Sequence, residues 1–251
     1  MHTLFLTFAA LAAATQVHAA PVLHVYGPGG PAPAIKEAAK RFEAKTGVKV
    51  EVVSGPTKAW LDQAKADGEV IYSGSETMMS DFVVALDGAL VPSTIQPLYL
   101  RGSSILVRKG NPKHIAGLRD LLQPGHRILV VNGAGQNGLW EDMAGRTGDL
   151  DAVRALRRNI VSVAASSAEA KTAWVKDPSL DAWIIWGIWQ VANPDLADQV
   201  PVEPAYRIYR DAGVGLTKRG QADSRAAAFA AFLASDEGAK IFARWGWLAR
   251  Q

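Results

Sequence analysis

Short apolar runs alternate with helical stretches along most of this chain. In the first part, strand-like runs lie at residues 23–26, 48–53 and 70–72. Each is followed by a segment with helical spacing, as in residues 31–45 after the first run. Parallel strands need such crossover helices, because a short turn cannot return the chain to the start of the next strand. The rhythm therefore predicts an α/β fold whose sheets are mostly parallel and flanked by helices.

The rhythm is interrupted by two long extended segments, at residues 98–109 and 202–211. A second strand and helix series lies between them, with strand-like runs at 128–131, 160–163 and 182–186. The pattern predicts two lobes joined by two extended crossovers. We expect residues 20–100 plus 212–251 to form lobe 1, and residues 101–211 to form lobe 2. The alternative is one continuous doubly wound sheet.

The N-terminus has the pattern of an export signal. An apolar, Ala-rich run extends from Leu4 to Thr15, and Val17-His18-Ala19 offers a small-x-small cleavage site. No Lys or Arg precedes the apolar run, so a buried N-terminal helix is the alternative. We predict a signal peptide over residues 1–19, cleaved near Ala19, and a protein of the periplasm. The absence of cysteine excludes a lipid-anchored cysteine, and no later segment is apolar and long enough for membrane insertion.

Composition disfavours several function classes. The net charge of +3 gives no signal for nucleic-acid binding. The sequence contains no G-x-S-x-G, H-E-x-x-H or G-K-[ST] motif, and the histidines after the leader, His24, His114 and His126, are scattered. We therefore expect no catalytic residues, no metal site and no cofactor, and we expect a monomer.

Three glycine- and hydroxyl-rich loops follow strands and precede helices in the first series. Loops of this kind offer backbone N–H and hydroxyl donors to an anion, and in a parallel sheet they gather at one edge. Ser and Thr at these positions also act as ordinary helix N-caps, which is the alternative interpretation. The candidate ligand-binding residues here are Gly29, Gly30, Ser54, Gly55, Thr57, Ser73, Gly74 and Ser75.

A fourth loop, residues 132–138, opens the second series and contains G-x-G-x-x-G. A dinucleotide site is disfavoured, because the loop is not in the first strand–helix unit and no acidic residue ends a strand about 20 residues later. The same geometry suits any small anion. Gly135, Gln136 and Asn137 are therefore candidate ligand-binding residues.

Two larger side chains complete the candidate set. Trp186, at the end of the apolar run 182–186, is expected to donate its indole N–H to a ligand, although a core position is the alternative. Arg101 lies in the first extended segment and is a candidate for binding an anion bidentately, with a surface charge as the alternative. Arg210, in the second extended segment, is the next candidate.

Several motifs together resemble the accessory colonization factor AcfC family. They are Tyr-Gly-Pro-Gly-Gly-Pro at 26–31, Pro-Leu-Tyr-Leu-Arg at 97–101, Val-Arg-Lys-Gly-Asn-Pro at 107–112, Asn-Gly-Ala-Gly-Gln at 132–136, Leu-Trp-Glu-Asp at 139–142, Asp-Ala-Trp at 181–183, Tyr-Arg-Asp at 209–211 and Trp-Gly-Trp at 245–247. The resemblance spans nearly the whole chain after the leader. It implies a type II periplasmic binding protein similar to those for sulfate and molybdate, with a ligand in the cleft between lobes. The first loop lacks the serine that molybdate binders often carry.

We therefore expect a periplasmic solute-binding protein for a small anion, with a sulfate-like tetrahedral oxyanion as the leading candidate. Its partner would be an ABC-transporter permease or a chemoreceptor. A small carboxylate, such as an acidic amino acid or a di- or tricarboxylate, is the alternative ligand. An exported α/β enzyme is the least favoured function.

Overall fold

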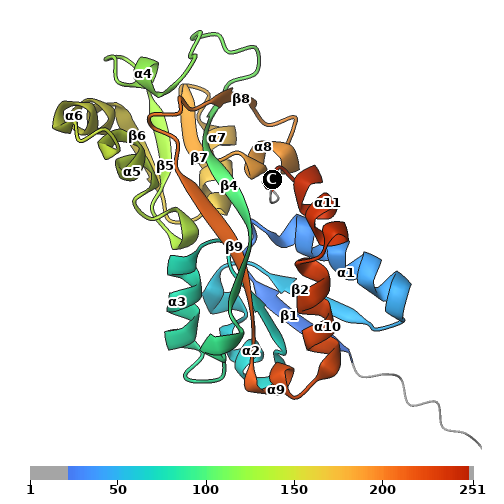
Figure 1. Ribbon diagram of the computed structural model, residues 1–251. Coiled ribbons are helices and arrows are strands. Elements are labelled where there is room, and N and C mark those ends of the chain that lie inside the picture. Colours follow the sequence, from blue (N-terminus) through green and yellow to red (C-terminus); the bar gives the residue numbers. More distant parts are fainter. Residues whose placement is uncertain (1–21, 249–251) are drawn as a thin grey trace, which may run out of the picture.

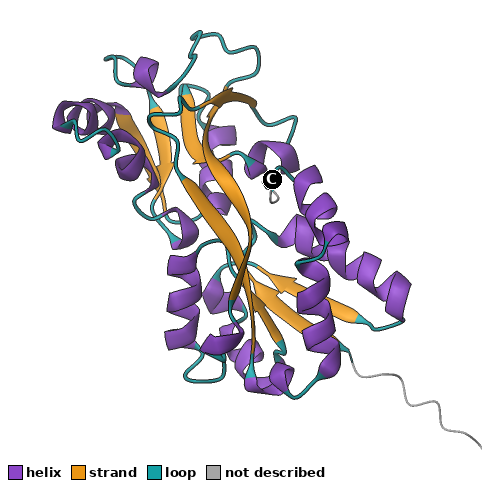
Figure 2. Cartoon of the chain, in the orientation of Figure 1, coloured by secondary structure: helices purple, strands orange, loops and turns teal. Residues whose placement is uncertain are grey.

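A computed structural model describes residues 22–248 (Figure 1), so the expected signal peptide at 1–19 lies outside the described residues. Helices and strands alternate as the sequence predicts (Figure 2). The strands are β1 Leu23–Gly27, β2 Val50–Ser54, β3 Val70–Tyr72, β4 Gln96–Val107, β5 Ile128–Val131, β6 Ile160–Ala164, β7 Ala182–Trp186, β8 Asp198–Pro201 and β9 Tyr209–Leu216. The α-helices are α1 Ala32–Thr46, α2 Leu61–Asp67, α3 Glu76–Ala85, α4 Leu118–Leu121, α5 Leu139–Gly145, α6 Leu150–Asn159, α7 Ser167–Lys176, α8 Ile188–Ala192, α9 Lys218–Gln221, α10 Ser224–Leu233 and α11 Asp236–Arg244. Short 3₁₀ turns are η1 Thr57–Ala59, η2 Pro92–Thr94 and η3 Ala134–Gln136.

One parallel group of strands is built around β1, which pairs with β2 on one side and β3 on the other. Successive side chains of a strand point to opposite faces. Leu23 and Val25 therefore pack with α1, α10 and α11, whereas Tyr26 packs with Trp60 and Phe82 on the other face. Helices cover both faces, which explains why β3 is buried along its whole length.

The second parallel group is built around β5, which pairs with β6 and β7. Leu129 and Val131 pack with Trp174 of α7 on one face. Val130 packs in the main core, which also contains Leu139 and Met143 of α5. Burial on both faces accounts for the unbroken apolar run of β7.

The long strands β4 and β9 connect the two groups. They pair antiparallel with each other over Gln96–Gly102 and Tyr209–Val214. β9 also pairs with β3, and β4 pairs with β7 and β8, so the hydrogen-bonded order is β2-β1-β3-β9-β4-β7-β5-β6. The two-lobed α/β fold with extended crossovers is confirmed, and the antiparallel strands are the crossovers themselves. The residue bounds proposed for each lobe stay a prediction.

The second crossover differs from the prediction of one extended segment over 202–211. The chain turns at Glu203–Tyr206, where Tyr206 N donates to Glu203 O, and the strand begins only at Tyr209. The Glu203 carboxylate accepts hydrogen bonds from the backbone N–H groups of Leu118 and Arg119. The turn therefore serves as an N-terminal cap for α4, a tertiary role that local sequence does not reveal.

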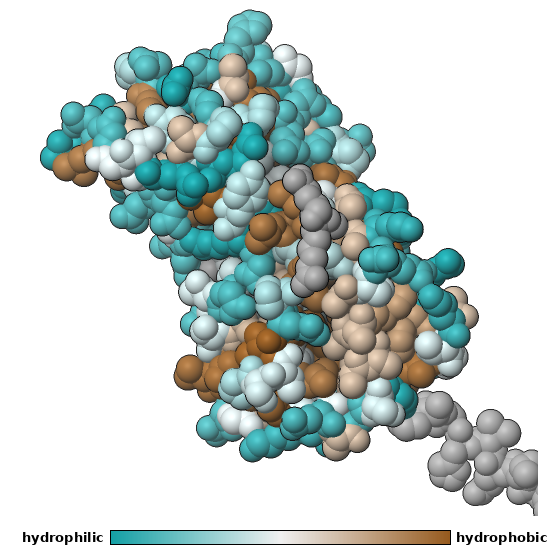
Figure 3. All heavy atoms as spheres, viewed as in Figure 1, coloured by the Kyte–Doolittle hydropathy of each residue, from teal (hydrophilic) through white to brown (hydrophobic). Residues whose placement is uncertain are grey.

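The surface in Figure 3 differs between the two ends of the molecule. The end with β5, β6, α5 and α6 is mainly hydrophilic, whereas apolar spheres gather over α10 at the other end. No helix within residues 22–248 combines the length and apolar character needed to cross a membrane. The loops at the carboxyl ends of β1, β2 and β3 lie opposite those that follow β5 and β6, and a cavity lies between them.

Candidate functional site

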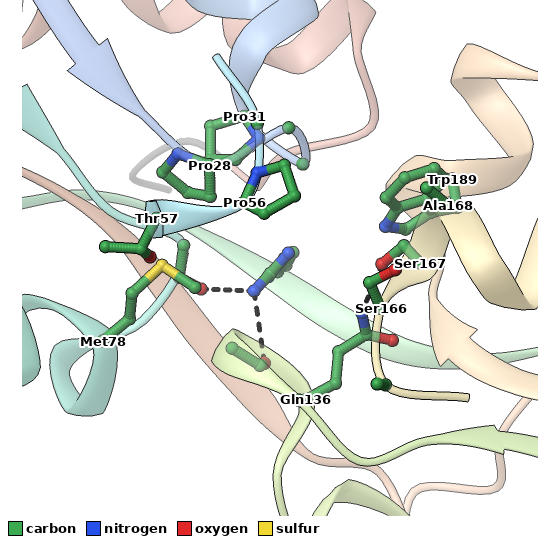
Figure 4. A pocket seen from close by; sticks show the side chains of 18 residues that line it. Pro28, Pro31, Pro56, Thr57, Met78, Gln136, Ser166, Ser167, Ala168 and Trp189 are labelled. Carbon is green, nitrogen blue, oxygen red and sulfur yellow. Dashed lines mark hydrogen bonds between the residues drawn. The ribbon is translucent and has the colours of Figure 1, made fainter. Parts of the chain in front are cut away.

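A cavity of about 250 Å³ lies between the two groups of strands (Figure 4). One side is built by the loops after β1, β2 and β3 and the other by the loops after β5 and β6 together with α8. Arg101 of β4 lies between the two sides. The lining residues are Pro28, Gly29, Gly30, Pro31, Gly55, Pro56, Thr57, Gly74, Met78, Arg101, Gly133, Gly135, Gln136, Ala165, Ser166, Ser167, Ala168 and Trp189.

Arg101 is the charged residue of the cavity, and its side chain is almost fully buried. Its Nη2 donates to the carbonyl oxygens of Gly74 and Gly135, one from each side of the cavity. The guanidinium carbon lies 4.6 Å from the ring centre of Trp186 and 5.4 Å from that of Trp247. These contacts hold the side chain in one orientation, and its positive charge is stabilised by two aromatic faces.

Glycine allows the backbone to approach this guanidinium closely. A Cβ atom at Gly74 or Gly135 would lie 3.0 Å from Nη2, and one at Gly30 would lie 3.1 Å from Nη1. The three loops therefore pack around Arg101 because they carry no side chains at these points. Nη1 lies beside Gly30 and has no hydrogen-bond partner within residues 22–248.

The charge of Arg101 has no carboxylate partner. No salt bridge joins it to an acidic residue within the described chain, and the cavity lining contains neither Asp nor Glu. Burial, with the positive charge of Arg210 adding to it, lowers the pKa of Arg101 to about 9, while Asp211 opposes the shift. Arg101 thus remains protonated at neutral pH, and its buried charge favours an anion in the cavity.

The N-terminus of α1 supplies further donors beside Arg101. No side chain caps this helix and no acidic residue lies in its first turn. Within residues 22–248, the backbone N–H groups of Gly29, Gly30, Ala32 and Ala34 have no acceptor. Free N–H groups and the positive end of a helix dipole stabilise negative charge. The α1 N-terminus and Arg101 Nη1 together form a corner, the α1 corner, that presents free donors and positive charge.

The predicted residues separate into two groups. Gly29, Gly30, Gly55, Thr57, Gly74, Arg101, Gly135 and Gln136 line the cavity. Ser54, Ser73, Ser75, Asn137 and Trp186 do not line it. The second group therefore lies outside the cavity lining, and its ligand role stays a prediction.

Local hydrogen bonds explain two of these exclusions. Ser73 Oγ accepts from Gly213 N, so it stabilises the junction of β3 with β9. Ser75 Oγ accepts from Met78 N as the N-cap of α3. This is the capping role that was the alternative interpretation of such residues. Ser54 ends β2, where it pairs with Gly27.

Two further exclusions involve the second lobe. Asn137 is exposed, and its carbonyl oxygen accepts from Arg210 Nη1 at 3.1 Å. Trp186 is fully buried, and its indole Nε1 donates to Gly135 O at 3.1 Å. Its N–H is therefore used within the protein, where it positions the loop that contacts Arg101. Arg210 also pairs with Asp142.

The tryptophan that does line the cavity is Trp189 of α8. Figure 4 shows its side chain beside Ser166, Ser167 and Ala168. Trp186 was the candidate because it ends the apolar run, but the chain enters a helix at Ile188. The change of period reorients the later tryptophan toward the cavity.

The loop Ala165–Ala168 was missed by sequence reasoning. It follows β6 and precedes α7, which is the same strand–loop–helix pattern that marked the other loops. Ser166 Oγ accepts from Glu169 N, and Ser167 Oγ hydrogen-bonds with Gln136 Nε2. Two adjacent serines after a strand were the available signal.

Comparisons with known proteins identify the family of this chain and proteins that share its fold. A model of the bacterial extracellular solute-binding protein family matches residues 23–248. A search of curated proteins finds no match. Among solved structures, L-phospholactate-bound PEB3, a protein of Campylobacter jejuni, is 36% identical, with 91% of this chain and 100% of that chain covered and a TM-score of 0.85.

Two more distant structures share the fold. The sulfate-binding protein SubI of Mycobacterium tuberculosis is 19% identical over 90% of this chain and 86% of its own, with a TM-score of 0.72. The periplasmic molybdate-binding protein of Azotobacter vinelandii is 19% identical over 91% of this chain and 100% of its own, with a TM-score of 0.67. The family match covers nearly all of the described residues, so this chain belongs to the bacterial extracellular solute-binding protein family.

Proposed function

We propose that this protein captures a small anion in the periplasm, and that the bound group is a tetrahedral oxyanion. The observation that carries the proposal is the buried Arg101, which lacks a carboxylate partner and lies beside the uncapped N-terminus of α1. An oxyanion there would accept hydrogen bonds from Arg101 Nη1 and from backbone N–H groups. It would also neutralise a charge that is costly to bury.

The relatives support an oxyanion as the bound group. PEB3 is described with L-phospholactate, which carries a phosphate, and the more distant proteins bind sulfate and molybdate. Within the family we place this chain with the AcfC-like proteins, on the motifs quoted above. An ABC importer or a chemoreceptor is the proposed partner, and the apolar leader at residues 1–19 supports export.

Calorimetry and thermal unfolding test the proposal. The purified protein is titrated with sulfate, molybdate, thiosulfate, phosphate and L-phospholactate. We expect at least one of them to bind and to raise Tm in a concentration-dependent manner. If none binds or raises Tm, the proposed function is wrong. Native mass spectrometry of protein purified from cells would identify a retained ligand independently.

A small carboxylate is the second candidate, because its oxygens could also accept from Arg101 Nη1 and from the free backbone N–H groups at the start of α1. Direct titration separates the two ligands. Calorimetry is performed with aspartate, succinate and citrate beside sulfate and phosphate. Binding of a carboxylate with none of the oxyanions would favour the second candidate, and binding of an oxyanion with no carboxylate would count against it.

Catalysis is not part of the proposed function. Recovery of the bound molecule unchanged after prolonged incubation, followed by NMR, is the expected result. Conversion of the ligand to a new species would instead favour an enzyme.

A further inference from the structure

Residues 245–248 follow α11 and form a short segment that we call the strap. At its start, Trp245 Nε1 donates to Glu37 Oε2 of α1 at 2.7 Å. Gly246, at a φ of 82°, then lies against α8, which is found beside the end of α11 in Figure 1. A Cβ atom at Gly246 would lie 2.9 Å from Val191 Cγ2 of α8. The strap therefore contacts helices from both sides of the cavity.

The strap is also fastened to β4, the strand that carries Arg101. Leu248 N donates to Leu100 O at 2.7 Å, and Leu100 N donates to Leu248 O at 3.2 Å. Trp247 is buried, and its ring centre lies 5.4 Å from the guanidinium carbon of Arg101. Neither Trp247 nor Leu248 lines the cavity. The strap thus contacts the cation from outside the cavity.

Arg101 needs such contacts if it is to bind an anion well. A long side chain loses rotamer entropy when it is fixed, and a side chain that becomes fixed only on binding adds this loss to the cost of binding. Nη2 of Arg101 is held by Gly74 O and Gly135 O, and Trp186 lies against one part of the guanidinium. Trp247 is the contact that the strap supplies. Together they fix the guanidinium before a ligand arrives.

We propose that Trp247 is a positioning residue for anion binding, and that it acts through Arg101. This inference rests on the proposed function, because Arg101 must first be the cation that binds the anion. Without the indole, the guanidinium would gain orientations that it must lose again when Nη1 binds the ligand. A residue that does not touch the ligand would thus contribute to its affinity.

Two substitutions at position 247 separate positioning from packing. Trp247→Leu keeps an apolar side chain but removes the aromatic face, whereas Trp247→Phe keeps a ring beside the guanidinium. Calorimetry is performed with the oxyanion that binds the wild type most tightly among sulfate, molybdate, thiosulfate, phosphate and L-phospholactate. Kd should rise about 3- to 10-fold in Trp247→Leu, or ~0.6–1.4 kcal/mol for ordering one arginine, and by less than about twofold in Trp247→Phe. Equal losses in the two variants would indicate packing alone and overturn the proposal.

Trp174→Leu is the matched control. Trp174 is as deeply buried as Trp247, and its ring centre lies 3.7 Å from the guanidinium carbon of a different arginine, Arg108. Neither Trp174 nor Arg108 lines the cavity. The control should lower Tm but leave the anion Kd within about twofold, because it leaves Arg101 in place.

A double-mutant cycle tests whether Trp247 acts through the cation. In the Arg101→Met background, Trp247→Leu should change Kd by less than about twofold, since no guanidinium remains to be positioned. The same factor in both backgrounds would overturn the proposal. If Arg101→Met binds too weakly to be measured, the comparison of Leu with Phe at position 247 decides alone.

Gly246→Ala is a second variant in case Trp247→Leu fails to fold. Its Cβ atom would meet Val191 of α8 at a backbone φ that disfavours alanine, so the strap must shift while Trp247 itself is retained. Kd should again rise about 3- to 10-fold, with circular dichroism showing a retained fold. An unchanged Kd in this variant would contradict the role of the strap.

The outcomes separate the two proposals. If the wild type binds an oxyanion and a folded Trp247→Leu variant binds it with the same Kd, the positioning role is wrong and anion binding stands. If the wild type binds none of the oxyanions, the proposed function is wrong and the positioning role is lost with it.

Discussion

Helices α1 and α7 both begin at the cavity, but their first turns are satisfied in different ways. The N-cap of α7 is Ser166, which accepts from Glu169 N, while the Glu169 carboxylate accepts from Ala165 N. This reciprocal arrangement is a capping box. The α1 turn has proline at the cap position and no side-chain acceptor. The comparison teaches that α7 carries a side-chain cap and α1 does not, although the N–H groups of Ser167 and Ala168 also have no acceptor within residues 22–248.

Placing an acidic side chain at the α1 start should remove the difference between the helices and produce the largest effect. In Gly30→Asp, the new carboxylate would lie beside Arg101 Nη1 and accept from the free N–H groups. We expect anion binding to be abolished and Tm of the unliganded protein to rise. Calorimetry and thermal unfolding measure both changes.

Gly30→Asn is the matched control, because it has the same shape without the charge. It should not raise Tm. If Asp and Asn behave alike, the corner is blocked by size alone and the electrostatic interpretation is wrong.

Removing the cation at the α1 corner should have the next largest effect. Arg101→Met keeps much of the side-chain length but removes the charge. A hydrogen bond to a charged group contributes ~1.5–3 kcal/mol, so anion Kd should rise about 10- to 150-fold. Circular dichroism checks that the fold is retained, and an unchanged Kd in a folded variant would contradict the role of Arg101.

A pH titration sharpens the comparison without a substitution. The pKa of Arg101 is about 9 in the free protein, and a bound anion raises it, because the anion stabilises the protonated form. Binding is therefore fully favoured below pH 9. Above it, affinity should fall by about tenfold per pH unit, since each unit corresponds to one pKa unit of linkage.

Sulfate is a suitable probe for this titration, since its charge is constant over the range. Calorimetry between pH 7 and 10.5 measures the change. An affinity that is flat through pH 10 would show that the charge of Arg101 is not lost there.

Breaking the α7 cap should have the smallest effect on binding. Ser166→Ala removes an N-cap acceptor, which costs about 1 kcal/mol of stability. Because Ser166 Oγ already accepts from Glu169 N, anion Kd should change by less than about threefold, less than the loss of one hydrogen bond of ~1 kcal/mol would cause. A large loss of affinity with normal stability would mean that α7 also serves the ligand.

Much of the fold follows from local sequence. The apolar runs of β1, β3, β5 and β7 were predicted within a few residues, because burial of both sheet faces leaves a plain apolar signal. The short helix α8 after β7 was not predicted. The Glu203–Tyr206 turn was not predicted, since its role depends on Leu118 and Arg119, which are distant in sequence.

The site was less predictable than the fold. Loops rich in glycine indicated where the backbone approaches a charged group, and Gly30, Gly74 and Gly135 do surround Arg101. The two roles of the serines could not be separated from sequence, because capping and ligand binding use the same hydroxyl, and only the fold shows that Ser75 caps α3. Trp186 and Trp189 could not be separated by spacing, since the strand ends between them.

The stacking of Arg101 on Trp186 and Trp247 has an optical consequence. The emission of an indole responds to the electric field across its ring, and both rings lie within 5.4 Å of the guanidinium carbon. Neutralisation of that cation by an anion alters the field at two tryptophans at once. The protein thus contains an intrinsic fluorophore pair beside Arg101, and occupancy of the proposed site should be measurable by tryptophan fluorescence in the unlabelled chain.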